Sequence, residues 1–327
     1  MDIILSYKRH KHIHKAKIYF IPLTLLCKNK NNIDVFNFDI DQIKTNPDSG
    51  FSMVYIYEHL NENKKIVMKL MTIFNDKIKQ ELNFYKYISK IKNYNLYICG
   101  FRKYVKEKYE NNEYHYLFLE YLERDIFDFM FRDQVEYSLY EAIDILKQVA
   151  RCLLFLHKHN IIYNDLKVEN IMITNEKPYK VKLIDFNCIT SLKNKNNLLN
   201  NIGSGTLAYM SPDLQNCIKE KNFKKLTFKS DCWGFGILIC NFLTNGLNLY
   251  ESKISDLKTI KNIQENKYEN KETLIEYFDK NCIFEKNKYI DKLVLLCHKC
   301  FKTNPKERLN LQKILDYLLK ISPDTLH

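Results

Sequence analysis

The sequence predicts an α+β fold in which strands dominate the first third of the chain and helices the rest. The expected strands are a hairpin over residues 35–57 and buried strands over residues 64–71 and 114–122. The expected helices, which have apolar residues at helical spacing, cover residues 75–91, 142–160, 229–246 and 309–321. The 327 residues, 46% of them hydrophobic, suffice for one domain of two lobes or for two small domains.

Composition narrows the class of partners. Lys and Arg number 51 against 39 Asp and Glu, which gives a formal net charge of +12. Heavy use of Lys, Asn, Ile and Tyr, with only 7 Gly and 6 Pro, indicates the mutational bias of an AT-rich genome, as in some parasitic protozoa. A basic surface can attract nucleic acid, acidic protein or anionic membrane, but no Arg-aromatic nucleic-acid motif accompanies the charge. We therefore favour a solvated, Lys-rich surface.

The ten cysteines follow no disulfide-framework spacing, and free thiols indicate a reducing, cytoplasmic location. Cys297 and Cys300 form a CxxC pair inside the apolar run LVLLCHKCF. A zinc or redox site would need a second pair or a thioredoxin-like context. We therefore predict two cysteines one helical turn apart in a core helix.

Residues 1–33 combine a basic run, KRHKHIHKAK, with the apolar run IYFIPLTLLC. The two runs are similar to the regions of a signal peptide, but the apolar run is shorter than a membrane span of about 20 residues. Pro22 also interrupts it. We expect a strand-like extension packed on the following domain, with targeting or membrane-surface binding as the alternative. His10, His12 and His14 alternate as exposed strand residues do, and metal binding is the other interpretation of them.

The most informative stretch, residues 161–187, reads IIYNDLKVENIMITNEKPYKVKLIDFN. Asp165 and Asp185 each follow an apolar run, as in catalytic loops carried by short strands. Asp165 can accept a proton from a hydroxyl nucleophile, and Lys167 can neutralise a moving phosphoryl group. Asn170 and Asp185 offer oxygen ligands of the kind that Mg²⁺ prefers.

These motifs identify a family resemblance. YNDLKVEN resembles the HRDLxxxN catalytic loop of eukaryotic protein kinases, and DFN resembles their DFG triplet. The resemblance covers residues 34–320 and implies a bilobal protein-kinase fold, with a small β-rich N-lobe (34–122) and a larger helical C-lobe (123–320). Residues 321–327 would form a short tail. ATP would sit between the lobes, with Mg²⁺ (or Mn²⁺) held by Asn170 and Asp185.

The resemblance also assigns nucleotide contacts. Lys69 in KKIVMKLM is similar to the lysine of the VAIK strand, which holds the α- and β-phosphates. Glu81, 12 residues later on a predicted helix, is the candidate to pair with it. Leu119 would be the gatekeeper, and the backbone from Glu120 to Leu122 would meet adenine. The remaining implied nucleotide contacts are Gly50, Val54, Val67, Asp125 (against the ribose) and Met172.

Several positions depart from the family pattern. Aligned on Val54, the three glycine positions of the GxGxxGxV loop hold Pro47, Ser49 and Ser52, and Gly50 is one place off, which predicts looser ATP binding. Asn164 replaces the arginine that binds an activation-segment phosphate, so we expect activity that does not depend on that phosphorylation. Tyr163 replaces the packing histidine. Asn187 replaces the DFG glycine, and asparagine tolerates positive φ better than most residues.

The later motifs are similar to the C-lobe of the family. GTLAYMSPDL resembles the end of the activation segment, and Thr206 together with Lys167 matches the Ser/Thr-kinase pattern. Asp213 should pair with Arg308, with one methylene less reach than the family's glutamate. Asp231 in DCWGFG should hold the backbone of the catalytic loop, beside the structural Trp233 and Gly236.

The sequence thus predicts a Ser/Thr protein kinase that transfers the γ-phosphoryl group of Mg-ATP to protein hydroxyls. Asp165 and Lys167 would be catalytic. The alternatives are a pseudokinase that acts as a scaffold or allosteric partner, and a kinase fold that acts on a small molecule. Competent residues at all six catalytic positions favour activity, because a decaying site usually loses its charges. These positions are Lys69, Glu81, Asp165, Lys167, Asn170 and Asp185. A calcium-regulated kinase is disfavoured because no EF-hand loop follows the domain.

Overall fold

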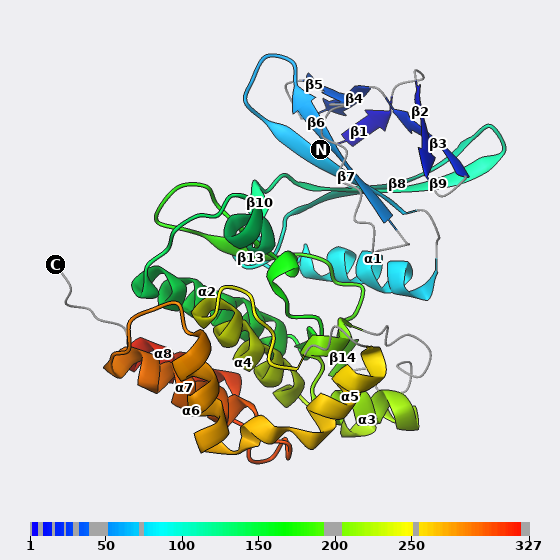
Figure 1. Ribbon diagram of the computed structural model, residues 1–327. Coiled ribbons are helices and arrows are strands. Elements are labelled where there is room, and N and C mark those ends of the chain that lie inside the picture. Colours follow the sequence, from blue (N-terminus) through cyan, green and yellow to red (C-terminus); the bar gives the residue numbers. More distant parts are fainter. Residues whose placement is uncertain are drawn as a thin grey trace. The chain divides into compact units, whose positions relative to one another are not determined.

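The computed structural model describes residues 2–5, 9–14, 17–22, 24–28, 33–38, 52–71, 75–192, 205–250 and 255–321. The chain forms two compact units. The first contains residues 1–95 and 99–122, and the second contains residues 96–98 and 123–327 (Figure 1). The first is rich in strands and the second in helices, so the predicted α+β class is confirmed.

The first unit is built on a seven-stranded sheet with the order β1-β4-β5-β6-β7-β9-β8, in which all neighbours are antiparallel. Its strands are β1 (Asp2–Leu5), β4 (Thr24–Lys28), β5 (Ile33–Phe38), β6 (Ser52–His59), β7 (Lys65–Met71), β8 (Phe101–Tyr109) and β9 (Asn112–Glu120). A separate hairpin joins β2 (Arg9–His14) and β3 (Lys17–Pro22). The strands predicted over residues 35–57, 64–71 and 114–122 are therefore confirmed.

The N-terminal residues extend this sheet beyond β5. Strand β4 pairs with β5, and β1 pairs with β4. Alternation along the strands turns Leu25 and Cys27 into the core, where they are fully buried. Ile21, near the end of β3, joins the same core, and the Tyr57 hydroxyl donates to the Pro22 carbonyl at 2.7 Å. The apolar run of the N-terminal region thus supplies two strands and part of the core. The side chains of His10, His12 and His14 lie outside the described part of the chain.

Helix α1 (Asp76–Ile88) is the long helix of the first unit and confirms the helix predicted over residues 75–91. Asn75 caps its start by accepting the Ile78 N–H at 3.1 Å. The predicted apolar face, which includes Ile78, Leu82 and Ile88, is buried. Glu81 lies on that buried side as well, which makes its burial dependent on a cationic partner.

The second unit is mainly helical and confirms the helices predicted over residues 142–160, 229–246 and 309–321. Its helices are α2 (Leu139–Lys158), α3 (Pro212–Glu220), α4 (Lys229–Leu243), α5 (Asp256–Glu265), α6 (Lys271–Asn281), α7 (Lys288–Cys300) and α8 (Leu311–Ile321). Its strands are β10 (Arg124–Asp125), β11 (Ile161–Ile162), β12 (Ile171–Ile173), β13 (Val181–Leu183) and β14 (Thr190–Ser191). Short 3₁₀ or π turns cover Tyr94–Leu96, Asp128–Arg132, Val168–Asn170, Leu207–Tyr209, Phe223–Lys225 and Lys267–Glu269.

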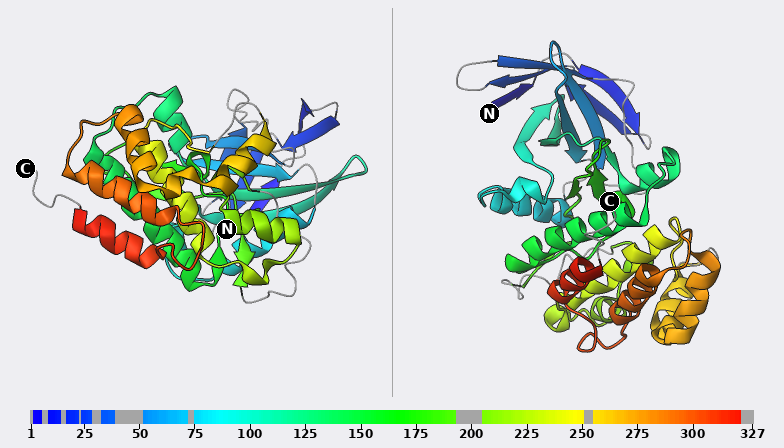
Figure 2. Two further views of the ribbon diagram at one scale, coloured as in Figure 1. Left: turned by 60° about the horizontal axis from the view of Figure 1, so that its bottom comes forward. Right: turned by 90° about the vertical axis from the view of Figure 1, so that its left-hand side faces the viewer.

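Helix α4 forms the centre of the helical unit. It is apolar on all sides, as expected for a helix buried all round, and it packs against both α2 and α7 (Figure 2). Helix α8 covers another side of α2. A capping box starts α2, because the Ser138 hydroxyl accepts the Glu141 N–H at 3.2 Å and the Glu141 carboxylate accepts the Ser138 N–H at 2.8 Å. Helix α2 is thereby fixed at the end opposite to the catalytic loop.

The predicted ion pair between Asp213 and Arg308 is confirmed, with Arg308 Nη2 at 2.9 Å from Asp213 Oδ1. The arginine side chain is completely buried and also donates to the carbonyls of Lys302 and Lys229. The second carboxylate oxygen, Asp213 Oδ2, is buried without a hydrogen-bond partner in the described part of the chain. The shorter aspartate therefore reaches its arginine with one oxygen only.

Nine of the ten cysteines are buried, and Cys282 is half-exposed. Cys297 and Cys300 lie one turn apart in α7 with fully buried side chains, which confirms the predicted core helix. Burial raises the pKa of the Cys297 and Cys300 thiols well above the usual range. Both Cys240 and Cys297 are free thiols, and Cys240 Sγ donates a hydrogen bond to Cys297 Sγ at 3.9 Å.

We expect a thiol reagent to label Cys282 first in the native protein, because only this thiol is partly exposed. Cys297 and Cys300 should react at the rate of unfolding, since both must leave the core and lose their raised pKa. Mass spectrometry of peptides after timed iodoacetamide labelling measures this order. Fast labelling of either α7 cysteine in the folded protein would contradict the assignment to the core.

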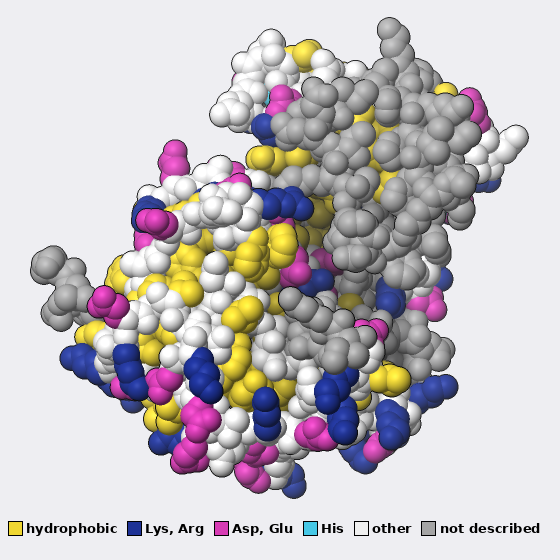
Figure 3. Space-filling model, in the orientation of Figure 1, with side chains coloured by type: hydrophobic (Ala, Val, Ile, Leu, Met, Phe, Trp, Pro, Cys, Tyr) yellow, Lys and Arg dark blue, Asp and Glu magenta, His cyan; other side chains and the backbone are white. Residues whose placement is uncertain are grey.

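The surface of the helical unit carries both signs of charge. On the face seen in Figure 3, Lys and Arg side chains are interspersed with Asp and Glu side chains. Exposed ion pairs include Lys286–Asp279 at 2.8 Å and Lys261–Glu265 at 3.4 Å. This mixture is typical of a solvated surface. No helix within the described residues is long and apolar enough to cross a membrane.

Candidate catalytic site

Helix α4 holds the backbone of the catalytic loop through the side chain of Asp231. Asp231 accepts the Tyr163 N–H at 2.9 Å and the Asn164 N–H at 2.8 Å, which confirms the predicted role of Asp231. His157, in the last turn of α2, lies with Nε2 at 2.7 Å from the same carboxylate. The carboxylate of Asp231 is fully buried, so these three contacts replace its lost hydration.

Asp165 is buried and its carboxylate is fixed at both oxygens. Oδ2 accepts from Asn170 Nδ2 at 2.9 Å, and Oδ1 accepts from the backbone N–H of Thr206 at 2.7 Å. Gly205 makes this approach possible, since a Cβ there would lie 2.9 Å from the Asn164 carbonyl oxygen and 3.2 Å from Asp165 Oδ1. Two donors, one from the catalytic loop and one from the activation segment, thus fix the orientation of the Asp165 carboxylate.

The hydrogen bonds of Asn170 fix the orientation of its amide. Its Nδ2 faces two acceptors, the backbone oxygen and Oδ2 of Asp165, both at 2.9 Å, so this atom must be the nitrogen. The amide oxygen then accepts no hydrogen bond from the described residues and keeps its lone pairs. The Asn170 carbonyl accepts the Ile184 N–H at 3.1 Å.

Antiparallel pairing of β12 with β13 places Asn170 and Asp185 at the same end of that hairpin. Asn170 directly precedes β12, and Asp185 follows β13 by two residues. Asp185 has a backbone φ of 55°, in the left-handed region that asparagine and aspartate adopt more readily than other side chains. Asn187 is not among the described residues with positive φ, so the tolerance of asparagine for that conformation is not used there.

Phe186 and Tyr163 form the packing behind this loop. Both are fully buried, with ring centroids 5.6 Å apart in an edge-to-face arrangement, which confirms the predicted packing role of Tyr163. The Tyr163 hydroxyl donates to the Ile184 carbonyl. Burial and then the charges of Asp165 and Asp185 raise the pKa of Tyr163 well above its usual value. The tyrosine is therefore a neutral donor that fixes the residue before Asp185.

The first unit contributes the predicted pair of Lys69 and Glu81. Lys69 Nζ donates to both carboxylate oxygens of Glu81, at 3.0 and 2.9 Å. The carboxylate side chain is 1% exposed and the lysine side chain 10%, so the pair is shielded from solvent. Strand register sets Lys69 opposite Val54, and Val67 opposite Leu119.

The predicted adenine and ribose contacts divide between the two units. In the first, the Glu120 N–H donates to the Gly100 carbonyl at 2.8 Å, and the Glu120 carbonyl accepts from the Cys99 thiol at 3.4 Å. The contact of the backbone from Glu120 to Leu122 with adenine stays a prediction. In the second, Asp125 and Met172 are cross-strand partners in β10 and β12. Asp125 Oδ1 accepts the Asp128 N–H at 2.7 Å, so this aspartate also caps the turn that follows it.

A comparison with protein-family models matches residues 48–318, more than half of the chain, to the protein kinase domain. The chain belongs to the protein kinase family. A curated relative, "Calcium-dependent protein kinase 5" of Plasmodium berghei (strain Anka), is 29% identical over 213 residues, which are 64% of this chain and 34% of the relative. The chain therefore spans about a third of the length of that kinase.

The kinase glycine loop falls outside the described residues, which include neither Pro47, Ser49 and Gly50 nor the side chain of Ser52. The predicted weakening of ATP binding by these positions stays a prediction. Lys167, the second catalytic candidate, is half-exposed at the start of the 3₁₀ turn Val168–Asn170. It has no ion pair with another described residue, and its catalytic role stays a prediction.

Two contacts of the kinase site were not predicted. His157 of helix α2 contacts the Asp231 carboxylate. This contact was not predicted because a histidine in a helix near a motif gives no specific signal in the sequence. Asn164, expected only as the absence of an arginine, donates from its side chain to Cys188 and Thr190. No signal in the sequence indicated the second contact, because its acceptors come close only in the folded chain.

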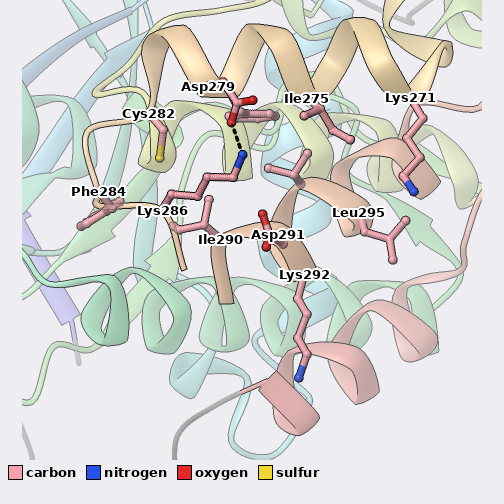
Figure 4. A pocket seen from close by; sticks show the side chains of 12 residues that line it. Lys271, Ile275, Asp279, Cys282, Phe284, Lys286, Ile290, Asp291, Lys292 and Leu295 are labelled. Carbon is pink, nitrogen blue, oxygen red and sulfur yellow. Dashed lines mark hydrogen bonds and ion pairs between the residues drawn. The ribbon is translucent and has the colours of Figure 1, made fainter. Parts of the chain in front are cut away.

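A cavity of about 580 Å³ lies apart from these kinase residues, between α6 and α7 (Figure 4). Apolar side chains such as Phe278, Ile290 and Val294 line it, together with the exposed Lys286–Asp279 ion pair. None of the residues predicted to bind nucleotide or metal lines this cavity. It is therefore not assigned to the catalytic site.

Proposed function

We propose that this protein kinase family member transfers the γ-phosphoryl group of ATP to serine or threonine hydroxyls of proteins. The observation that carries the proposal is the buried carboxylate of Asp165, fixed by Asn170 Nδ2 and the Thr206 N–H. A carboxylate so held is oriented before the substrate arrives, and most of the acceleration in phosphoryl transfer comes from such positioning. Asp165 would orient the acceptor hydroxyl and accept its proton.

The donor set of the second unit fits Mg²⁺. Asn170 Oδ1 and the Asp185 carboxylate are hard oxygen ligands held at one end of the β12–β13 hairpin. No group of three or more His, Cys, Asp and Glu side chains suited to a metal occurs among the described residues. The pair of oxygen ligands, Asn170 Oδ1 and the Asp185 carboxylate, suits Mg²⁺, which proteins bind through one or two side chains together with substrate phosphates. The ion would neutralise charge on the ATP phosphates.

Two lysines would serve the phosphates directly. Lys69, oriented by the carboxylate of Glu81, would bind the α- and β-phosphates as a point charge. Lys167 would stabilise the negative charge that moves with the γ-phosphoryl group. The same lysine, two residues after Asp165, supports serine and threonine over tyrosine as acceptors, because it belongs to the Ser/Thr-kinase form of the loop.

A pseudokinase that acts as a scaffold is the second candidate, and the sequence of the glycine loop favours it. Pro47 lacks the N–H that a phosphate would accept, and Ser49 and Ser52 add side chains where glycines bring the backbone close. Retention of the buried Lys69–Glu81 pair speaks against it, since an unused buried charge pair brings no clear gain in stability.

The deciding experiment measures ³²P transfer from Mg-ATP to a generic protein substrate by the wild type and by Asp185→Asn. Signal from the wild type and a loss of about 100-fold or more in the variant would support the enzyme and its metal ligand. Phosphoamino-acid analysis of the product tests the serine and threonine assignment. Equal background from both proteins, with Mn²⁺ also tried, would favour the scaffold, and a thermal shift with ATP would show whether it still binds nucleotide.

A further inference from the structure

We propose that Asn164 is a positioning residue whose side-chain amide fastens the start of the activation segment to the catalytic loop. The inference rests on the proposed kinase function and adds a residue to its machinery. Asn164 touches no reacting group. It acts through its neighbours, by holding Cys188 and Thr190 at the start of the segment in a fixed position relative to Asp165.

The contacts of the amide are specific. Asn164 Nδ2 donates to the Cys188 carbonyl at 2.9 Å and to the Thr190 hydroxyl at 2.8 Å, so both of its hydrogens are used. The residue is 7% exposed, and Thr190 is fully buried. Hydrogen bonds so shielded compete with no water and fix the relative position of two chain segments 24 to 26 residues apart.

The backbone aims the amide at these acceptors. Asn164 has a φ of 66°, in the left-handed region, where asparagine is among the few side chains found regularly. Its N–H is held by Asp231 Oδ1 at 2.8 Å, which prevents the turn from relaxing. A longer or β-branched residue would meet a steric cost here, and glycine would keep the turn but lose the amide.

The two ends of the activation segment are therefore held by consecutive residues. Asn164 holds Cys188 and Thr190 at one end, and Asp165 accepts the Thr206 N–H at the other. Pairing of β11 with β14, which sets Ile162 opposite Thr190, reinforces the first contact. The fastening uses a neutral amide, so it needs neither a charge on the segment nor an added phosphate.

The chemistry also explains why the residue is an amide and not an acid. Asn164 Oδ1 is buried with no hydrogen-bond partner in the described part of the chain. An aspartate at this position would bury a charge there and turn a second oxygen toward the Cys188 carbonyl, which is a repulsive contact. The donor pair of the amide outweighs the one unpaired acceptor.

The test compares full-length Asn164→Gly and Thr190→Val with Thr190→Ser, which keeps the hydroxyl, after unfolding curves show that each is folded. We expect kcat for protein phosphorylation to fall about tenfold in Asn164→Gly and less in Thr190→Val, the equivalent of one to two neutral hydrogen bonds. The KM for ATP should stay within twofold, and Thr190→Ser should retain the wild-type kcat. In the double variant, Thr190→Val should add nothing to Asn164→Gly.

Hydrogen exchange of residues 188–192 gives a readout that needs no kinase activity. We expect faster exchange there in Asn164→Gly than in the wild type, with exchange in helix α8 unchanged as the internal reference. If the wild type proves inactive but this exchange difference is found, the proposed function fails while the fastening stands. Unchanged exchange and unchanged kcat, or additive effects of the two substitutions, would overturn the role of Asn164.

Discussion

Replacing Asp165 with asparagine is expected to lower kcat for phosphoryl transfer by about 10²–10⁴-fold, the usual contribution of a general base. The amide is nearly isosteric with the carboxylate, so the loop should fold. Its oxygen can still accept the Thr206 N–H, which now lies 2.7 Å from Asp165 Oδ1. What the variant loses is the ability to take a proton from the acceptor hydroxyl.

A second effect adds to the first. The new amide nitrogen would face Asn170 Nδ2, which lies 2.9 Å from Asp165 Oδ2, and two donors cannot bond each other. If Asn170 turned its amide over, its Oδ1 would accept from the new amide but would face the backbone oxygen of residue 165 and would no longer be free for a cation. Either orientation therefore disturbs Asn170. We therefore expect the variant to need more Mg²⁺ for half-maximal rate, in addition to its lower kcat.

Kinetics at several Mg²⁺ concentrations, with a thermal shift to follow ATP binding, measure both effects. The matched control is Asp291→Asn, an exposed aspartate on α7 that lies outside the catalytic loop. This control should retain the wild-type kcat and Mg²⁺ dependence. If Asp165→Asn kept more than a tenth of the wild-type kcat, the carboxylate would not be the base, and the hydrogen bonds around it would serve the fold alone.

The residues of the candidate site could be predicted because their geometry is local. Asp165, Asn170 and the loop between them are linked by hydrogen bonds that span five residues. A short motif therefore encodes the arrangement directly. The Lys69–Glu81 pair joins a strand to the next helix, and burial of one helix face forces its glutamate toward a cation. In both cases few conformations satisfy the buried charges.

The added strands of the first unit could be anticipated as strands but not as members of a particular sheet. Pairing of β1 with β4, and of β4 with β5, depends on edge-to-edge hydrogen bonds for which no short pattern gives the partner or the register. The side chain of Asn164 escaped prediction for a related reason. Its acceptors, Cys188 and Thr190, come close only after the segment has folded back on β11.

The position of the left-handed turn near Asn187 could not be predicted either. The sequence indicated only that asparagine, at the family's glycine position, would tolerate a positive φ. The structure places the positive φ at Asp185, where the chain leaves β13 after the Tyr163 hydroxyl has fixed the Ile184 carbonyl. The positive φ thus falls directly after the residue whose carbonyl the Tyr163 hydroxyl holds, and two residues before Asn187.

Replacing Arg308 with alanine is expected to lower the free energy of unfolding by about 3–5 kcal/mol, the cost of removing one partner of a buried ion pair. The arginine bonds Asp213 Oδ1 at 2.9 Å and Lys302 O at 2.9 Å, and its guanidinium lies 5.3 Å from the ring centre of Trp233. Alanine would leave a carboxylate and several carbonyls without donors. Since Trp233 is the single tryptophan of the chain, its fluorescence during urea unfolding reports this region directly.

Asp213→Glu is the informative companion, because the present aspartate uses one oxygen and leaves Oδ2 buried without a partner within the described residues. One more methylene would let both oxygens reach the guanidinium, and a bidentate pair should be as stable as the wild type or more stable by about 1 kcal/mol. Asp213→Ala should cost less than Arg308→Ala, since the carbonyls of Lys302 and Lys229 still bond the arginine. If Arg308→Ala cost under 1 kcal/mol, or Asp213→Glu cost as much as Asp213→Ala, then packing around Trp233 and not the ion pair would hold this end of the activation segment to the helices.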